Sequence, residues 1–87
     1  MSFSLVYTNR AVKDINKLEQ KIQNRIGNAL KKYEKDPMLY AVKLSDPRLG
    51  SYRFRIGDFR VIFDIEGEDI VILRVGHRSE IYRRLGR

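Results

Sequence analysis

Residues 52–63 constrain the fold more than any other part of this 87-residue chain. They read Tyr-Arg-Phe-Arg-Ile-Gly-Asp-Phe-Arg-Val-Ile-Phe, so apolar and cationic side chains alternate up to a Gly-Asp pair and again after it. Alternation with a period of two among aromatic and β-branched residues indicates strands, and Gly-Asp is a two-residue turn signal. The segment therefore predicts a β-hairpin with Gly57 and Asp58 at its tip.

This hairpin would bring positive charges together on one face. With a Gly-Asp loop, Arg55 lies directly opposite Arg60, and Arg53 lies on the same face. Like charges that face each other across a strand pair are destabilising. Because a bound anion would remove that penalty, we expect the function to lie on the arginine face.

The N-terminal half predicts one strand and two helices. Apolar residues alternate over residues 2–7, which predicts a short strand with one buried face. They then recur at helical spacing over residues 11–18 and 22–33, after Thr8 or Asn9, either of which can cap a helix. Two short antiparallel helices are the preferred interpretation, and one bent helix is the alternative because no Gly or Pro breaks the pattern near residue 20.

The C-terminal half completes an α+β domain. We expect a loop or short strand around residues 41–44, the arginine hairpin, and a further strand at 70–75 that ends in a short C-terminal tail. The expected order is β-α-α-β-β-β, with a helical hairpin packed on one face of a small antiparallel β-sheet. One domain should cover residues 1–87.

The second turn gives a register for the predicted sheet. With Gly67 and Glu68 at its tip, Arg60 pairs with Val75, and Val75 and His77 lie near the arginine face. Arg74 then falls on the helix-facing side, unless a β-bulge shifts the register or this residue lies at the end of the sheet.

Composition narrows the function classes. The net charge of +7, from 18 basic and 11 acidic residues, favours nucleic acid, an anionic membrane surface or an acidic protein as partner. The chain has no cysteine, which excludes a disulfide and a thiolate nucleophile, and its apolar runs are too short to span a membrane. Its first residues lack the features of a signal peptide, so we expect a cytoplasmic protein.

The hairpin also contributes to a resemblance that extends over essentially the full length. The helical hairpin, Lys43-Leu44, residues 52–63 and the ending Val75-Gly76-His77-Arg78-Ser79-Glu80-Ile81-Tyr82 resemble the RelE/ParE superfamily of bacterial and archaeal toxins. The resemblance implies one of two activities: RelE-type members cut messenger RNA in the ribosomal A site without metal, and ParE-type members poison DNA gyrase. Members of both branches are neutralised by a small antitoxin encoded alongside. The intact His-Arg-x-x-x-Tyr ending, with cations on adjacent strands, favours the RelE branch.

That resemblance implies a site built from arginine and tyrosine. Metal-free RNA cleavage needs a base for the 2′-hydroxyl, cations for the charge on the phosphorane and an acid for the leaving 5′-oxygen. The predicted catalytic residues are Arg60, Arg78, Tyr82 and His77, and the predicted RNA- or phosphate-binding residues are Arg53, Arg55, Lys43, Arg83 and Arg84.

Each predicted role has a structural alternative. Arg60 would stabilise the transition state, and Arg78 would clamp phosphate or donate a proton, unless it is a surface residue paired with Glu80. Tyr82 would stack on a base or help to move a proton, unless it merely docks on the sheet. His77 would act as general base, although a lone histidine beside a strand end is more often structural.

The preferred function is therefore a ribosome-dependent messenger RNA endonuclease that needs no metal or cofactor and does not act at a membrane. Its partners would be the ribosome, messenger RNA and an acidic antitoxin. The alternatives are a ParE-like gyrase inhibitor and a non-catalytic basic module whose main partner is an antitoxin.

Overall fold

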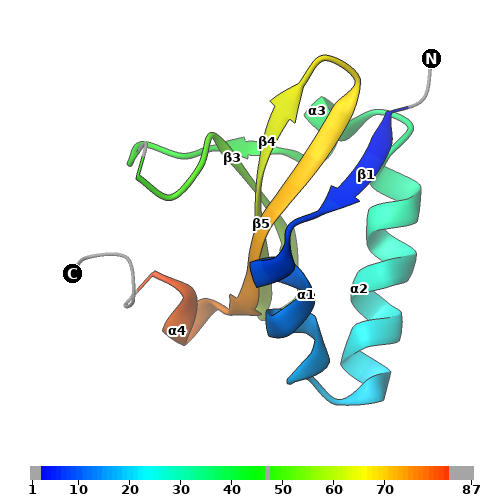
Figure 1. The fold of residues 1–87 in the computed structure, drawn as a ribbon, viewed down its shortest axis with the longest axis vertical. Coiled ribbons are helices and arrows are strands. Elements are labelled where there is room, and N and C mark those ends of the chain that lie inside the picture. Colours follow the sequence, from blue (N-terminus) through cyan, green and yellow to red (C-terminus); the bar gives the residue numbers. More distant parts are fainter. Residues whose placement is uncertain (1–2, 47, 83–87) are drawn as a thin grey trace.

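The computed structural model describes residues 3–46 and 48–82 (Figure 1). Its elements in chain order are β1 (Ser4–Tyr7), α1 (Asn9–Asn16), α2 (Gln20–Tyr33), α3 (Pro37–Tyr40), β2 (Val42–Lys43), β3 (Tyr52–Ile56), β4 (Phe59–Glu66), β5 (Asp69–His77) and α4 (Arg78–Ile81). The predicted α+β class is confirmed, with two separate helices rather than one bent helix. The four-residue helices α3 and α4 were not predicted. Within the described residues, no helix has both the length and the apolar character needed to cross a membrane.

The five strands form one sheet in the order β1-β5-β4-β3-β2. The pairs β2–β3, β3–β4 and β4–β5 are antiparallel, whereas the pair β1–β5 is parallel, so the sheet is mixed rather than wholly antiparallel. A parallel pair such as β1–β5 cannot be joined by a tight turn and needs a long connection. Here the connection runs through α1, α2, α3 and the other three strands.

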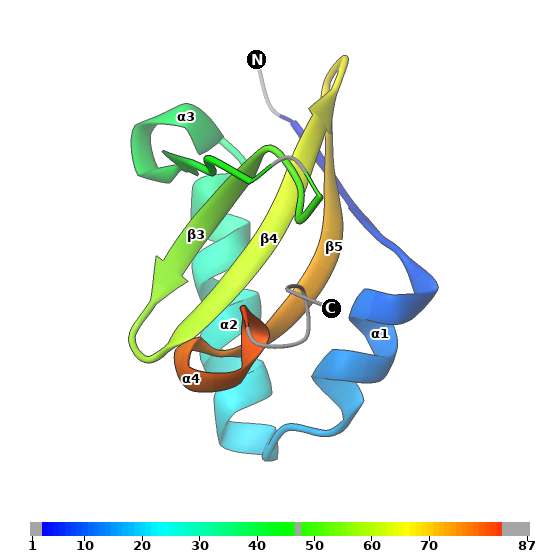
Figure 2. The same ribbon diagram turned by 90° about the vertical axis from the view of Figure 1, so that its left-hand side faces the viewer.

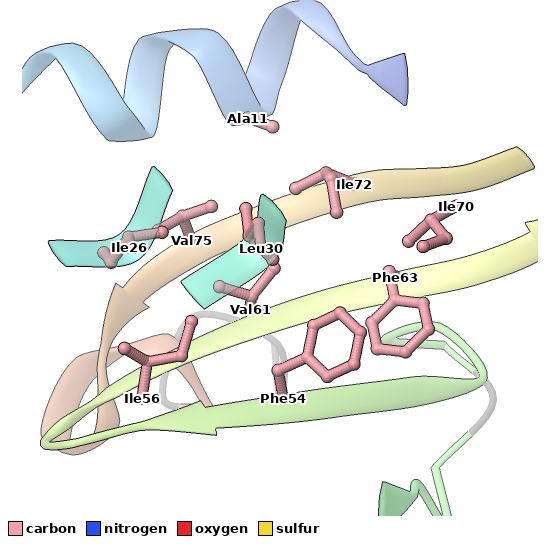
Figure 3. Close-up of a cluster of buried hydrophobic side chains, with 10 residues drawn as sticks. All are labelled: Ala11, Ile26, Leu30, Phe54, Ile56, Val61, Phe63, Ile70, Ile72 and Val75. Atoms are coloured by element: carbon pink, nitrogen blue, oxygen red, sulfur yellow. The ribbon is translucent and has the colours of Figure 1, made fainter. Parts of the chain in front are cut away.

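Thr8 fixes the junction between β1 and α1. Its side-chain oxygen accepts a hydrogen bond from Ala11 N (3.2 Å) and caps α1, while its hydroxyl donates to Ile72 O (2.9 Å) in β5. The apolar stripe of α2 packs on the sheet through Ile26 and Leu30, which are almost fully buried (Figure 3). The core that they share with the sheet consists of Ala11, Ile26, Leu30, Phe54, Ile56, Val61, Phe63, Ile70, Ile72 and Val75.

The arginine hairpin forms with the predicted register. Arg55 pairs with Arg60, and the strand ends Ile56 and Phe59 meet directly at the turn. Gly57 has φ +59°, the left-handed conformation that a type II′ turn requires at its first central position and that glycine adopts without strain. The prediction of like charges opposed across this hairpin is thus confirmed.

A β-bulge makes the register between β4 and β5 differ from the predicted one. The pairing shifts by one residue between Ile62 and Phe63, where Leu73 is the additional residue on β5. Arg60 consequently pairs with Gly76 and not with Val75, and Val75 turns into the core, where it is 4% exposed. A one-residue shift moves every later side chain to the other face.

The two faces of the sheet are covered differently. α2 lies behind the sheet, whereas α4 and residues 48–51 lie in front of it, near its two ends (Figure 2). We call the front of β3 and β4 the open face and define it by Arg53, Arg55, Arg60, Ile62 and Asp64. Gly50 allows the close approach at one end, because a Cβ there would lie 2.8 Å from Ile62 Cγ2.

Candidate nucleic-acid interface on the open face

Arg60 lies deep in the open face and is only 8% exposed. Its Nη1 donates to Gly57 O (2.8 Å) and to Phe59 O (2.9 Å), so the side chain bends back beneath the hairpin turn. Its strand partner is Gly76, and a Cβ placed on Gly76 would lie 3.7 Å from the Cβ of Ile81 in α4. The guanidinium is therefore held by neutral carbonyl oxygens, and its positive charge remains uncompensated locally.

Arg53 is held in a similar way. Its Nη1 donates to the Tyr82 hydroxyl at 2.9 Å, and its Cζ lies 5.8 Å from the centre of the Tyr82 ring. Its Nε is buried and has no hydrogen-bond partner among the described residues. Such an orphaned buried donor is uncommon and costly, so hydrogen bonding within the fold does not account for an arginine at this position.

The arginines of the open face share one property. Within residues 3–46 and 48–82, the ion pairs are Arg48–Asp46, Arg74–Asp14 and Arg78–Asp58. Arg53, Arg55 and Arg60 form none of them. Three guanidinium groups on one face that form no ion pair with a described carboxylate can attract a polyanion such as a nucleic-acid backbone.

Arg74 differs, because Asp14 of α1 neutralises it. Asp14 Oδ2 accepts from Arg74 Nε (2.8 Å) and from Val75 N (3.0 Å). The side chain of Asp14 is only 9% exposed and that of Arg74 only 15%. The bulge pairs Arg74 with Ile62, so Arg74 lies on the Ile62 side of the sheet and not on the helix-facing side where the predicted register put it. Sequence reasoning missed Asp14, although an acidic residue within the apolar stripe of α1, three residues after Ala11, was the available signal.

The predicted register puts His77 near the arginine face, but in the structure His77 lies on the opposite side of the sheet. It pairs with Phe59 and shares its side of the sheet, which α2 covers, with the two rings edge to face at 5.4 Å. Its Nδ1 accepts from Ser79 N (3.1 Å) and caps α4. A neutral ring bound in this way carries its proton on Nε2 and has no free lone pair, so the arrangement makes His77 an anchor for α4.

The remaining predicted residues divide into three groups. Tyr82 lies on the open face through its bond to Arg53, and Arg78 is tied to the hairpin turn, with its N donating to Asp58 O (2.8 Å) and its Nε 3.8 Å from Asp58 Oδ1. Lys43 is exposed and pairs with Tyr52, which places it on the side away from Arg53, contrary to its expected part in this surface. Arg83 and Arg84 lie outside the described residues.

The interface thus consists of Arg53, Arg55, Arg60 and Tyr82, with Arg78 at its rim. Among the described residues, no three His, Asp or Glu side chains come together as a metal site would require.

Known proteins are similar to this chain in both sequence and fold. The profile of the family described as the ParE toxin of the type II toxin–antitoxin system, parDE, matches residues 5–82. The toxin RelG of Mycobacterium tuberculosis is 31% identical over 97% of this chain and 100% of its own length, and the toxin RelE3 of Methanocaldococcus jannaschii is 27% identical over 90% and 93%. The crystal structure of the toxin–antitoxin complex RelBE2 from M. tuberculosis contains a chain that superposes with a TM-score of 0.80, at 26% identity, over 90% of this chain and 100% of that one.

The family profile covers most of the chain, one relative is matched over its whole length, and the fold agrees with a solved complex. The chain therefore belongs to the RelE/ParE superfamily of toxins from type II toxin–antitoxin systems and is RelE-like.

Proposed function

We propose that this toxin is a ribosome-dependent endoribonuclease that cuts messenger RNA by attack of a 2′-hydroxyl on the adjacent phosphate. The observation that carries the proposal is the set of arginines on the open face that meet no carboxylate among the described residues. Arginine is suited to this task because its planar fork of donors binds phosphate in a bidentate way and its charge is permanent.

The reaction uses these groups for charge stabilisation. The 2′-oxygen forms a bond to phosphorus, the bond to the 5′-oxygen breaks, and the products are a 2′,3′-cyclic phosphate and a 5′-hydroxyl end. Arg60, which is fixed by two carbonyl oxygens, would face the phosphorane and stabilise its growing negative charge without having to reorganise. Arg53 and Arg55 would hold the neighbouring backbone phosphates.

Tyr82 supports the same face by orienting Arg53. Its hydroxyl accepts a hydrogen bond from Arg53 Nη1 (2.9 Å) and so holds the guanidinium in place; proton transfer by this hydroxyl is the alternative role, which the loss of activity on its removal decides. His77 keeps its lone pair in the cap of α4 and supports the site from the other side of the sheet. We assign it a positioning role and no proton transfer.

An acidic antitoxin is the proposed protein partner in the cytoplasm. The net charge of +7 attracts a negatively charged segment, and a structural relative of this chain is a component of a toxin–antitoxin complex. Such a segment would compete with RNA for the open face, because both would neutralise the same arginines.

The test is primer extension on messenger RNA translated by purified ribosomes with and without the toxin. We expect cuts in phase with codons, and Arg60→Ala should reduce their rate roughly 100-fold or more, the loss typical of one preorganised transition-state donor. Arg10→Ala is the matched control, because it removes the same charge from an exposed residue of α1 that is not part of the interface. Equal rates for the two variants, or intact messages with the wild type, would refute the proposal.

A second candidate is a gyrase inhibitor, which is favoured by the match to the ParE toxin family. Inhibition of gyrase supercoiling by the purified protein, together with intact ribosome-bound messages, would establish this candidate instead.

A further inference from the structure

The tip of the arginine hairpin carries a cation that comes from a distant part of the sequence. A Cβ placed on Gly57 would lie 2.8 Å from Arg25 Cζ and 2.9 Å from Arg25 Nη1. The guanidinium of Arg25, which lies on α2, therefore covers the α-carbon of Gly57. The absence of a side chain at Gly57 makes room for it, in addition to permitting the positive φ.

Packing on Gly57 holds Arg25 in place but does not use its hydrogen-bonding capacity. No hydrogen bond or ion pair joins the Arg25 side chain to another described residue, and the residue is exposed. A guanidinium that is fixed by contact on its face keeps its edge donors free for an acceptor from solvent. Less rotational freedom is then lost when a phosphate binds, which favours binding.

Other guanidinium groups meet at the same turn. Arg60 donates to the carbonyl of Gly57, and Arg78 lies 3.8 Å from the carboxylate of Asp58. Figure 2 shows the hairpin tip beside α4, with α2 behind it. Three cations thus surround a two-residue turn that carries a single carboxylate, and the side chain of Asp58 is 67% exposed.

We propose that this hairpin tip, through Arg25 and Arg78, is a second phosphate-binding subsite that holds the RNA backbone beside the open face. The inference rests on the proposed function, because it takes the ligand to be the RNA strand that the open face binds. It extends the interface around the end of the sheet to α2, and it gives Arg25 a binding role that its position in the sequence did not suggest.

The test is binding of a 12-nucleotide 2′-O-methyl RNA, which cannot be cleaved, measured by fluorescence anisotropy over a range of salt concentrations. Each phosphate contact contributes about 0.7 to the slope of log K against log salt for single strands. Arg25→Gln should make the slope shallower by about that amount and weaken binding roughly threefold to fivefold, as expected for one exposed ionic contact. Arg25→Lys keeps the charge and should restore the slope.

Arg10→Gln is the matched control, because it makes the same substitution on an exposed residue of α1. If Arg25→Gln and Arg10→Gln change slope and affinity equally, or if Arg25→Lys does not restore the slope, the subsite is refuted. Cleavage of ribosome-bound messages by the wild type would then still support the proposed function. If the wild type does not cleave these messages but Arg25→Gln still lowers the salt slope and the affinity, the proposed function is refuted and the RNA subsite is supported.

Asp58 provides a test of opposite sign. Asp58→Asn removes the carboxylate at the turn and should tighten RNA binding about threefold. Asp36→Asn raises the net charge by the same amount at an exposed position whose side chain makes no capping bond, and it should have a smaller effect. Equal tightening in both variants would show that only net charge matters and would refute the subsite.

Discussion

Arg53 and Arg74 lie on either side of Ile62 in the same row of the sheet, yet their charges are met in opposite ways. Asp14 compensates Arg74 with two hydrogen bonds to its guanidinium. The side chain of Arg53 donates only to the hydroxyl of Tyr82, and its Nε has no hydrogen-bond partner among the described residues. The difference separates a charge that stabilises the fold from one that is kept available for a ligand.

The physical basis is the cost of removing a charge from water. A buried cation is tolerated when a carboxylate and further hydrogen bonds replace its hydration shell, as they do around Asp14. A cation that is held only by neutral oxygens keeps its field and attracts an anion. We therefore expect variants on the two sides of Ile62 to have crossed effects, on stability for one and on activity for the other.

The largest expected effect is on stability. Asp14→Ala should lower the free energy of unfolding by roughly 3–5 kcal/mol, because it leaves Arg74 without its counter-charge and Val75 N without an acceptor. Urea denaturation followed by circular dichroism measures this loss, and exposed Asp36→Ala is the control. Adding Arg74→Met to the Asp14 variant should recover part of the loss, since no unpaired charge remains. A loss below about 1 kcal/mol would show that the pair is not structural.

Arg53→Met should have the opposite profile. Methionine fills the space of the aliphatic stem and removes the orphaned Nε, so the free energy of unfolding should change by less than about 1 kcal/mol. Cleavage of ribosome-bound messages should fall roughly 10-fold or more, because a neighbouring backbone phosphate loses a charged donor worth about 1.5–3 kcal/mol. Rates from primer extension and urea midpoints measure the two quantities. A stability loss as large as that of Asp14→Ala would remove the distinction between the two arginines.

The local parts of the fold could be predicted from sequence. The hairpin follows from alternation around Gly57 and Asp58, and it put Arg53, Arg55 and Arg60 on one face as the structure has them. Each of these inferences uses residues that are close together in the chain, where turn chemistry and side-chain alternation determine the geometry.

The parts that could not be predicted depend on contacts distant in sequence or on a single inserted residue. The bulge at Leu73 shifts the register by one, which sends Val75 into the core and His77 to the α2 side. Arg25 meets Gly57, and Asp14 meets Arg74, only after α1 and α2 have packed on the sheet. No local pattern contains these partners, so the site could be predicted in its centre but not at its edges.

A smaller effect is expected where Tyr82 meets Arg53. Tyr82→Phe keeps the ring beside Arg53 but removes the hydroxyl that accepts its Nη1 hydrogen bond. Loss of one such bond, worth about 1 kcal/mol, should slow cleavage roughly fivefold, with kcat affected more than KM. Single-turnover rates on ribosome-bound messages measure this change. A loss above about 100-fold would instead show that the hydroxyl transfers a proton in the reaction.

The smallest effect is expected at the exposed counterpart of the Asp14–Arg74 pair. Arg48 donates hydrogen bonds from its side chain and its backbone to Asp46, and these bonds lower the pKa of the Asp46 carboxyl. A lowered carboxyl pKa adds stability above the unfolded-state pKa, and that stability is lost as the pH falls through the folded-state pKa. Solvent screens this pair, so Asp46→Asn should lower the urea midpoint only slightly at pH 7. In the wild type, the small contribution of the pair should disappear only in the acid range. If Asp46→Asn shifted the midpoint as far as Asp14→Ala does, burial would not be what distinguishes one aspartate–arginine pair from the other, and the contrast between Arg74 and Arg53 would need another cause.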